Sequence, residues 1–357
     1  MPAYNVEIFS PDFLLKYHDN IGTVKYSEDY ISPVENSAVI RTDDTVTKGD
    51  LIRIGQLNDD YFGVVTSVDY GEAEGQQMTV YYKPYTSLFN TDVLFDTDRQ
   101  GTGSMETELK KIIEDNFVNN ADQIQNIPSI GDITIVSNTT GWGLNLKSDT
   151  EGMHHCIVNF YDVFLVNGFR KYGISITVSP DYSEKKVNLE IGIVGTGAVT
   201  IETGLPNIIK KSIVIRETSD DTNKLEIYNT ANYTERIIYY LHPDGTYDTS
   251  NTDRIEPVSR DIRAVGTEEG KTFQDAAASE AASVFGQIQY DNLIEITALK
   301  SGGILDATKY RFGQVVRVIH NGNAYESIFS GMEIGDTVKL SFGVIRLDLT
   351  KIVKRRA

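Results

Sequence analysis

"GQVVRVIHNGNAYESIFSGM", residues Gly313 to Met332, predicts a β-hairpin, because two β-rich runs flank Asn321-Gly322, a strong signal for a two-residue turn. The segment "GDLIRIGQLNDDYFGVVTSV", Gly49 to Val68, aligns with it without gaps. Three residue types coincide in the alignment, namely Gly49 with Gly313, Arg53 with Arg317 and Tyr61 with Tyr325. We therefore predict that the two segments form equivalent strands of two similar barrels. The shared residues are interpreted as setting barrel geometry, not chemistry.

The strands of this repeat carry apolar residues on both faces. Side chains alternate between the faces of a strand, so Ile52 and Ile54 share one face and Leu51 lies on the other. Such a strand has to be covered on both sides. A neighbouring subunit or an inserted domain could supply the cover, or both faces could be covered within the monomer.

The chain has 357 residues, too many for one ordinary core, so about two to four domains are expected. Its 51 acidic and 33 basic residues give a net charge of -18. This balance argues against a nucleic-acid-binding surface, because phosphate binding requires clustered Lys and Arg. The single cysteine, Cys156, excludes an intrachain disulfide. No signal peptide or membrane-spanning run is found, so we expect a cytoplasmically made protein without a membrane anchor.

Short strand-like runs separated by polar or glycine-rich turns dominate the sequence, as is typical of small antiparallel barrels. Two helices are expected. One is Ser104–Asn120, with its first residue as the N-cap, and the other is Thr272–Phe285, in which Thr272 and Asp275 form a capping pair. Asn167-Gly168 predicts a further hairpin. The expected fold class is therefore mainly β with α+β insertions.

Signals of enzymatic chemistry are weak. The HHC triplet, His154 to Cys156, lacks further ligands at zinc-site spacing, and the cysteine is interpreted as a buried, inert thiol at the start of a strand. Gly192 to Val199 is glycine-rich, but its spacing does not fit a dinucleotide site. No catalytic, cofactor-binding or metal-binding residue is predicted, and no cofactor is expected.

A longer pattern points to a family. In "NKLEIYNTANYTERIIYYLHPDGTYDTSNTDRIEPV", Asn223 to Val258, a strand, a YYL…DGT turn and an R…PV element precede an alanine-rich helix. The pattern resembles baseplate hub proteins of long-tailed bacteriophages. More closely, it resembles the N-terminal structural region of tail-associated lysin or tail-tip proteins of siphophages. Gly63 to Phe95 is similar to the family's first barrel, and Phe342 to Val353 to its last strand.

The resemblance implies two tube-like small β-barrels plus two further domains. The first barrel would be residues 1–100, followed by an α+β domain at 101–190. The second barrel would combine 191–220 with 300–345, and a small α+β domain would combine 221–299 with 346–357. Three copies would form a ring, so that a homotrimer presents six barrels to a sixfold tail tube.

The implied function is that of a non-enzymatic baseplate hub or tail-tip protein of a phage or prophage. It would cap the tail tube and take part in host attachment and genome delivery. The implied partners are a distal tail protein, tail-tube proteins, and tail fibre or receptor-binding proteins. Genome DNA would pass through without specific binding, and the acidic balance suggests the hypothesis of a channel lining that does not bind phosphates. The implied location is the virion tail tip, and the host cytoplasm during assembly.

Two alternatives stay open. One is a peptidoglycan-degrading tail-associated lysin, although in such relatives the lytic domain lies downstream of the hub region and would lie beyond this chain. The other is the hub of a bacterial phage-like injection or secretion device, which shares the fold.

Overall fold

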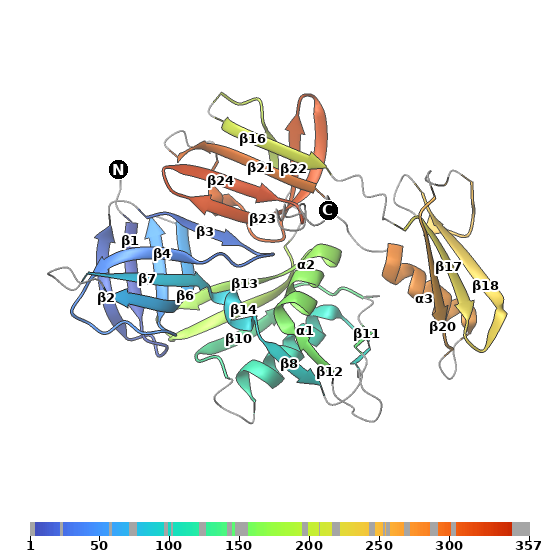
Figure 1. The fold of residues 1–357 in the computed structure, drawn as a ribbon, viewed down its shortest axis with the longest axis horizontal. Helices are drawn as coiled ribbons and strands as arrows, with labels where there is room; N and C mark the ends of the chain where they lie inside the picture. Colours follow the sequence, from blue (N-terminus) through green and yellow to red (C-terminus); the bar gives the residue numbers. More distant parts are fainter. Residues whose placement is uncertain are drawn as a thin grey trace, which may run out of the picture.

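The computed structural model is dominated by strands, which confirms the mainly β fold class (Figure 1). No helix among the described residues is long and apolar enough to cross a membrane. The structure describes residues 4–21, 24–56, 59–70, 77–95, 99–100, 103–120, 126–140, 145–146, 156–194, 199–206, 208–215, 222–242, 247–252, 254, 258–267, 272–285, 292–300 and 305–344.

The first sheet lies at the N-terminal side of the molecule, in blue in Figure 1. Its strand order is β2-β1-β5-β6-β7-β4, and every neighbouring pair is antiparallel. Alternating buried residues on β4 and β7 turn one face of each strand towards the core. The strands are β1 (Tyr4–Phe9), β2 (Leu15–Ile21), β4 (Asn36–Arg41), β5 (Leu51–Gln56), β6 (Asp59–Tyr70) and β7 (Gln77–Pro84), after which a 3-10 helix, η1 (Tyr85–Phe89), follows.

The second sheet contains the C-terminal strands, drawn mostly in orange and red in Figure 1. Its order is β15-β22-β23-β24-β21-β16, and an N-terminal strand, β3 (Tyr26–Asp29), also pairs with β23. Strand β21 lies in the range expected to belong to the small α+β domain, but it pairs with β16 and β24. The other elements are β15 (Val199–Glu202), β16 (Ile208–Ile215), β21 (Asn292–Leu299), η6 (Ala307–Lys309), β22 (Val315–His320), β23 (Asn323–Ile334) and β24 (Thr337–Phe342).

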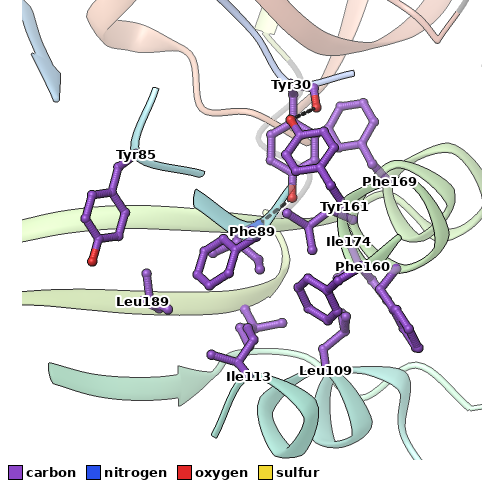
Figure 2. Packing of buried hydrophobic residues seen from close by; sticks show 14 of the residues in the cluster. Tyr30, Tyr85, Phe89, Leu109, Ile113, Phe160, Tyr161, Phe169, Ile174 and Leu189 are labelled. Carbon is purple, nitrogen blue, oxygen red and sulfur yellow. Dashed lines mark hydrogen bonds between the residues drawn. The ribbon is translucent and has the colours of Figure 1, made fainter. Parts of the chain in front are cut away.

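Between the two sheets in the sequence lies an α+β unit. Its three-stranded sheet has the order β10-β14-β13, and helical segments pack on it around an aromatic core (Figure 2). The unit also contains the strand pairs β8–β12 and β9–β11. Its elements are β8 (Asp92–Phe95), β9 (Arg99–Gln100), α1 (Met105–Ile113), η2 (Glu114–Val118), β10 (Ile130–Ile135), β11 (Asn145–Leu146), β12 (Cys156–Asn159), η4 (Tyr161–Val166), α2 (Asn167–Tyr172), β13 (Ile174–Asp181) and β14 (Lys186–Ile193).

The hairpin predicted at Asn167-Gly168 is wrong, because this dipeptide lies inside the continuous helical segment formed by η4 and α2. Aromatic and β-branched residues, which favour strands, are frequent here, but the buried residues recur at helical spacing. Tyr161, Leu165 and Phe169 are four residues apart and all buried. Gly168 allows a close approach of another helix, since a Cβ at this position would lie 2.9 Å from Cε of Met105. Packing therefore overrode the local turn signal.

The helix predicted at Ser104–Asn120 is confirmed, with its N-cap and with apolar residues buried along one side. The Thr107 N–H donates to Ser104 Oγ at 3.1 Å, which makes Ser104 the N-cap. The last turn of the segment widens into the π-helix η2. The buried stripe consists of Leu109, Ile112, Ile113 and Phe117.

The fourth unit is a small sheet with one helix, set apart from the rest of the chain in Figure 1. The sheet has the order β19-β18-β17-β20, and α3 (Phe273–Phe285) packs on it around a core of its own. The predicted capping pair is confirmed. The Thr272 N–H donates to Asp275 Oδ2 at 3.0 Å, and the Asp275 N–H donates to Thr272 Oγ1 at 3.2 Å. The strands are β17 (Lys224–Asn229), β18 (Asn232–Leu241), β19 (Tyr247–Asp248) and β20 (Arg260–Val265).

Both faces of β5 are covered within the chain. Ile52 and Ile54 belong to a core that contains buried residues of the first and the second sheet. Leu51, on the opposite face, packs into the core of the α+β unit. The inserted unit thus supplies the second cover, and β5 needs no neighbouring subunit for it.

Candidate functional site: the duplicated unit and its junction

The hairpins β5–β6 and β22–β23 have the same pairing register. Each pair in the second hairpin follows its counterpart in the first by 264 positions, which is the offset between Gly49 and Gly313 in the sequence alignment. The two predicted hairpins are therefore equivalent in backbone pairing. Among the matched pairs are Leu51–Val64 with Val315–Ile328, and Ile54–Tyr61 with Val318–Tyr325.

The two glycines of the repeat occupy the same backbone position. The Gly49 N–H donates to the carbonyl of Val65 at 2.9 Å, and the Gly313 N–H donates to the carbonyl of Phe329 at 3.0 Å. Their φ angles are +94° and +87°, in a region that side chains with a Cβ rarely adopt. Glycine is needed at both sites because the chain must turn there to enter the hairpin.

The equivalence extends beyond the hairpins to a four-stranded unit. The strand order β5-β6-β7-β4 in the first sheet corresponds to β22-β23-β24-β21 in the second. In both, the strand that precedes the hairpin in the sequence lies beside the strand that follows it. A register shift falls between Val65 and Ser67 in one unit and between Phe329 and Gly331 in the other, again 264 positions apart. We call these four strands the duplicated unit.

The arginines of the repeat lie in different surroundings. Arg53 donates through Nη1 to Glu7 Oε2 at 3.0 Å, and its guanidinium lies 5.2 Å from the ring centre of Tyr182 in the α+β unit. Arg317, at the equivalent position of β22, is exposed. Among the described residues, the shared arginine therefore contacts the α+β unit in the first copy and faces solvent in the second.

The tyrosines of the repeat also differ in burial. Tyr61 is fully buried and packs against the rings of Tyr26 and Tyr82, and burial raises the pKa of its hydroxyl well above the usual value. Tyr325 is half-buried against the same core. The two tyrosines therefore occupy matched ladder positions on one core but differ in how deeply they are buried.

Strand β3 joins the two duplicated units. It precedes β4 in the sequence, yet it pairs with β23 of the second sheet, from Tyr26 opposite Ile334 to Asp29 opposite Gly331. The Tyr30 N–H continues this ladder by donating to the carbonyl of Ser330 at 2.9 Å. The N-terminal region thus contributes a strand to the C-terminal sheet.

Tyr30 also connects this junction to the α+β unit. Its hydroxyl accepts a hydrogen bond from the Ile176 N–H at 2.9 Å, and its carbonyl accepts one from the Tyr161 hydroxyl at 2.6 Å. Its ring stacks on Phe169 at 4.6 Å and also contacts Phe312 from the segment before β22. Figure 2 shows the Tyr30, Tyr161 and Phe169 rings together. One residue therefore connects three parts of the fold.

A cavity of about 400 Å³ lies at this junction. Aromatic rings form much of its wall, and Glu28 lies on it without an ion pair among the described residues. Burial raises the pKa of the Glu28 carboxyl to about 7. The lining residues are Glu28, Asp29, Tyr30, Phe62, Thr86, Ile176, Thr177, Val178, Ser179, Pro180, Tyr182, Tyr310, Arg311, Phe312, Phe329 and Met332.

The described part of the chain contains no cluster of three His, Cys, Asp or Glu residues that could hold a metal ion. His154 and His155 lie outside the described residues, and only the backbone of Cys156 is described, at the start of β12. The glycine-rich segment Gly192 to Val199 begins at the end of β14 and ends at the start of β15, and 195–198 between them lie outside the described residues.

The junction residues carry no signal that sequence reasoning could use. Tyr30 and Glu28 lie in a short polar segment, and the hydrogen-bond partners of Tyr30 are more than a hundred positions away in the chain. The only local sign is the short run of strand-forming residues around Tyr26. The repeat itself was detectable, because its glycines and its hairpin turns leave local patterns.

Comparison with known proteins places this fold among tail proteins of phage type. No family model matches the sequence, and no curated protein matches it. The tail protein from Neisseria meningitidis has a TM-score of 0.55 at 12% identity, over 96% of this chain and 96% of that chain. The 43 kDa tail protein of prophage MuSo2 from Shewanella oneidensis has a TM-score of 0.52 at 10% identity, over 95% of this chain and 98% of that chain.

A third solved structure agrees with these two. The prophage tail protein gp18 from Listeria monocytogenes has a TM-score of 0.51 at 9% identity, over 99% of this chain and 98% of that chain. All three likenesses cover nearly the whole of both chains. They show that this chain shares its fold with prophage and other tail proteins.

Proposed function

We propose that this chain is a structural subunit of a phage-type tail tip, in which three copies form a baseplate hub ring that caps the tail tube. The observation that carries the proposal is the duplicated unit, four strands that recur in the same order and register within one chain. A subunit with two like units lets a threefold ring present six similar units. The fold shared with three tail proteins supports this function.

The proposed role is assembly and not catalysis. The partners would be tail-tube proteins, a distal tail protein and the fibres or receptor-binding proteins of the tip. In this role the hub takes part in host attachment and genome delivery. The net charge of -18 suits a ring through which DNA passes without binding.

Solution mass tests the assembly. We expect sedimentation equilibrium to show three times the chain mass of 39.8 kDa as concentration rises, and electron microscopy to show rings. A chain that stays monomeric both alone and with tail-tube protein would contradict the hub. Zymography on bacterial cell walls tests the absence of catalysis, since clearing by this chain would contradict a purely structural role.

A further inference from the structure

The duplicated units differ in how one strand edge is covered. In the second unit, Gly331 to Ile334 of β23 pair with β24 on one side and with β3 on the other. The counterpart of this stretch in the first unit is Ser67 to Tyr70 of β6, 264 positions earlier. There, β7 pairs on one side, and the ladder with β5 ends at Val64. No other described strand pairs with this part of β6.

The side chains on this part of β6 are more exposed than their counterparts on β23, as expected if no strand takes the place of β3. The side chain of Tyr70 is 66% exposed, whereas its counterpart Ile334 is fully buried. Ser67 and Asp69 are exposed as well. An unpaired strand edge presents N–H and C=O groups to any extended chain, and proteins commonly block such edges with charged side chains, especially lysine, or with proline. The stretch from Thr66 to Tyr70 contains no lysine and no proline, and Asp69 is its one charged residue.

We propose that the edge of β6 from Thr66 to Tyr70 is an interface for a second copy of this chain. An extended segment of that copy adds to β6 as an antiparallel strand, in the place that β3 takes on β23. The inference rests on the proposed function. If first and second sheets alternate around the ring, the second sheet of one copy lies next to the first sheet of the next copy. The contact between copies then resembles the contact between the two sheets of one chain.

The β3–β23 contact defines the geometry of the new one. Because the Tyr30 N–H bonds the carbonyl of Ser330, the alternation of an antiparallel ladder puts the polar groups of every second residue on that edge. The counterparts on β6 are Thr66, Val68 and Tyr70. The carbonyl of Thr66 and the N–H and C=O groups of Val68 and Tyr70 therefore face the open edge, where they can hydrogen-bond an added strand.

Charge adds a requirement on the incoming strand. Lys25, next to β3, forms an ion pair with Glu333 of β23 at 2.7 Å. The counterpart of Glu333 on β6 is Asp69, which is also acidic. The incoming segment therefore carries a basic residue near the position that faces Asp69.

Hydrogen–deuterium exchange on the wild-type chain tests the interface. We expect peptides covering Thr66 to Tyr70 to exchange at least about tenfold more slowly at high than at low protein concentration, because the added strand protects their amides. The matched control is the peptide Gly331 to Ile334, which β3 already covers and whose exchange stays constant. An assembled trimer with fast exchange at Thr66 to Tyr70 would overturn the inference and leave the hub intact.

Val68→Pro is the second test. Proline lacks the N–H that Val68 presents to the open edge, and the substitution leaves the hydrogen bonds between β6 and β7 in place. We expect this variant to keep its circular dichroism spectrum and to assemble at least about tenfold more weakly. An unchanged trimer would overturn the inference. If Val68→Pro fails to fold, the exchange result decides alone. A wild-type chain that never assembles would contradict the proposed function, and with it the inference. That outcome is seen in the solution mass, whereas failure of the inference alone is seen in hydrogen–deuterium exchange.

Discussion

Gly49 and Gly313 share a backbone conformation but not a neighbourhood. A Cβ at Gly313 would lie 2.8 Å from Ser175 Oγ, whereas a Cβ at Gly49 would have no described heavy atom within 4 Å apart from its own chain neighbours. Both glycines have positive φ angles, so alanine is strained at either site. Only the second copy of the repeat adds a steric conflict with the α+β unit.

This pair predicts unequal effects of one substitution. Gly49→Ala is expected to lower the free energy of unfolding by about 1 kcal/mol, from backbone strain alone. Gly313→Ala is expected to cost about 2–4 kcal/mol, because the methyl group must also displace Ser175. Urea unfolding of both variants measures the difference. Equal losses of unfolding free energy in the two variants would show that Ser175 does not hinder a methyl group at position 313.

The hydrogen bonds of Tyr30 predict a second effect. Tyr30→Phe leaves the buried Ile176 N–H without its acceptor, and Tyr161→Phe removes the donor to the Tyr30 carbonyl. Each change is expected to cost about 1–3 kcal/mol. Tyr85→Phe is the matched control, because the buried hydroxyl of Tyr85 has no hydrogen-bond partner among the described residues. Thermal unfolding should show no loss for the control, and a similar loss in all three variants would refute this reading.

The third prediction concerns Glu106, at the start of α1, and its contribution to stability at different pH values. Its buried carboxylate accepts hydrogen bonds from Ser137 Oγ at 2.6 Å and from the Thr139 N–H and Oγ1, each at 2.8 Å. Burial alone would raise the pKa of Glu106, but these hydrogen bonds outweigh it and lower the pKa. Stability from Glu106 is therefore present above the unfolded pKa and is lost as the pH falls through the folded pKa.

We expect Glu106→Ala to cost about 2–4 kcal/mol at neutral pH, because three donors lose their acceptor. Glu108→Ala, in the same helical turn but only half-buried, is the control and should cost about 0.5 kcal/mol. Urea unfolding at pH 7 measures both. The loss in Glu106→Ala should shrink as the pH is lowered through the acidic range, and a pH-independent loss would argue against the carboxylate.

Glu28 predicts a pH dependence of opposite sign. Burial raises its pKa to about 7, above the unfolded value near 4.5, so the folded chain holds this proton more tightly than the unfolded chain. Ionisation of Glu28 therefore destabilises the fold progressively as the pH rises from about 4.5 to about 7. Glu28→Gln removes this effect. We expect the variant to match the wild type near pH 4.5 and to be more stable by at most about 3 kcal/mol near pH 8.

Unfolding of wild type and Glu28→Gln at both pH values tests this prediction. Because Asp29 and Arg311 line the same cavity, the difference between variants is the relevant quantity, and not the pH profile of either chain alone. A difference that does not change between pH 4.5 and pH 8 would show that Glu28 is not desolvated in the folded chain.

Local sequence patterns determined the elements that depend on neighbouring residues. The hairpin turn at Asn321-Gly322 has φ angles of 51° and 82°, as a two-residue turn of this composition requires. The caps at Ser104 and Thr272 and the apolar stripe of α1 were predictable for the same reason. So was the pairing of the repeat, because identical spacing around the two glycines imposes the same register.

Tertiary structure decided what depends on distant residues. The segment from Tyr161 to Tyr172 is helical because the aromatic core of the α+β unit buries one side of it, although its composition favours strands. Strand β3 joins the second sheet and not the first, because Tyr30 is held by partners more than a hundred residues away. The sequence by itself determined that the chain repeats a unit. How the two copies meet follows only from packing between segments that no local pattern connects.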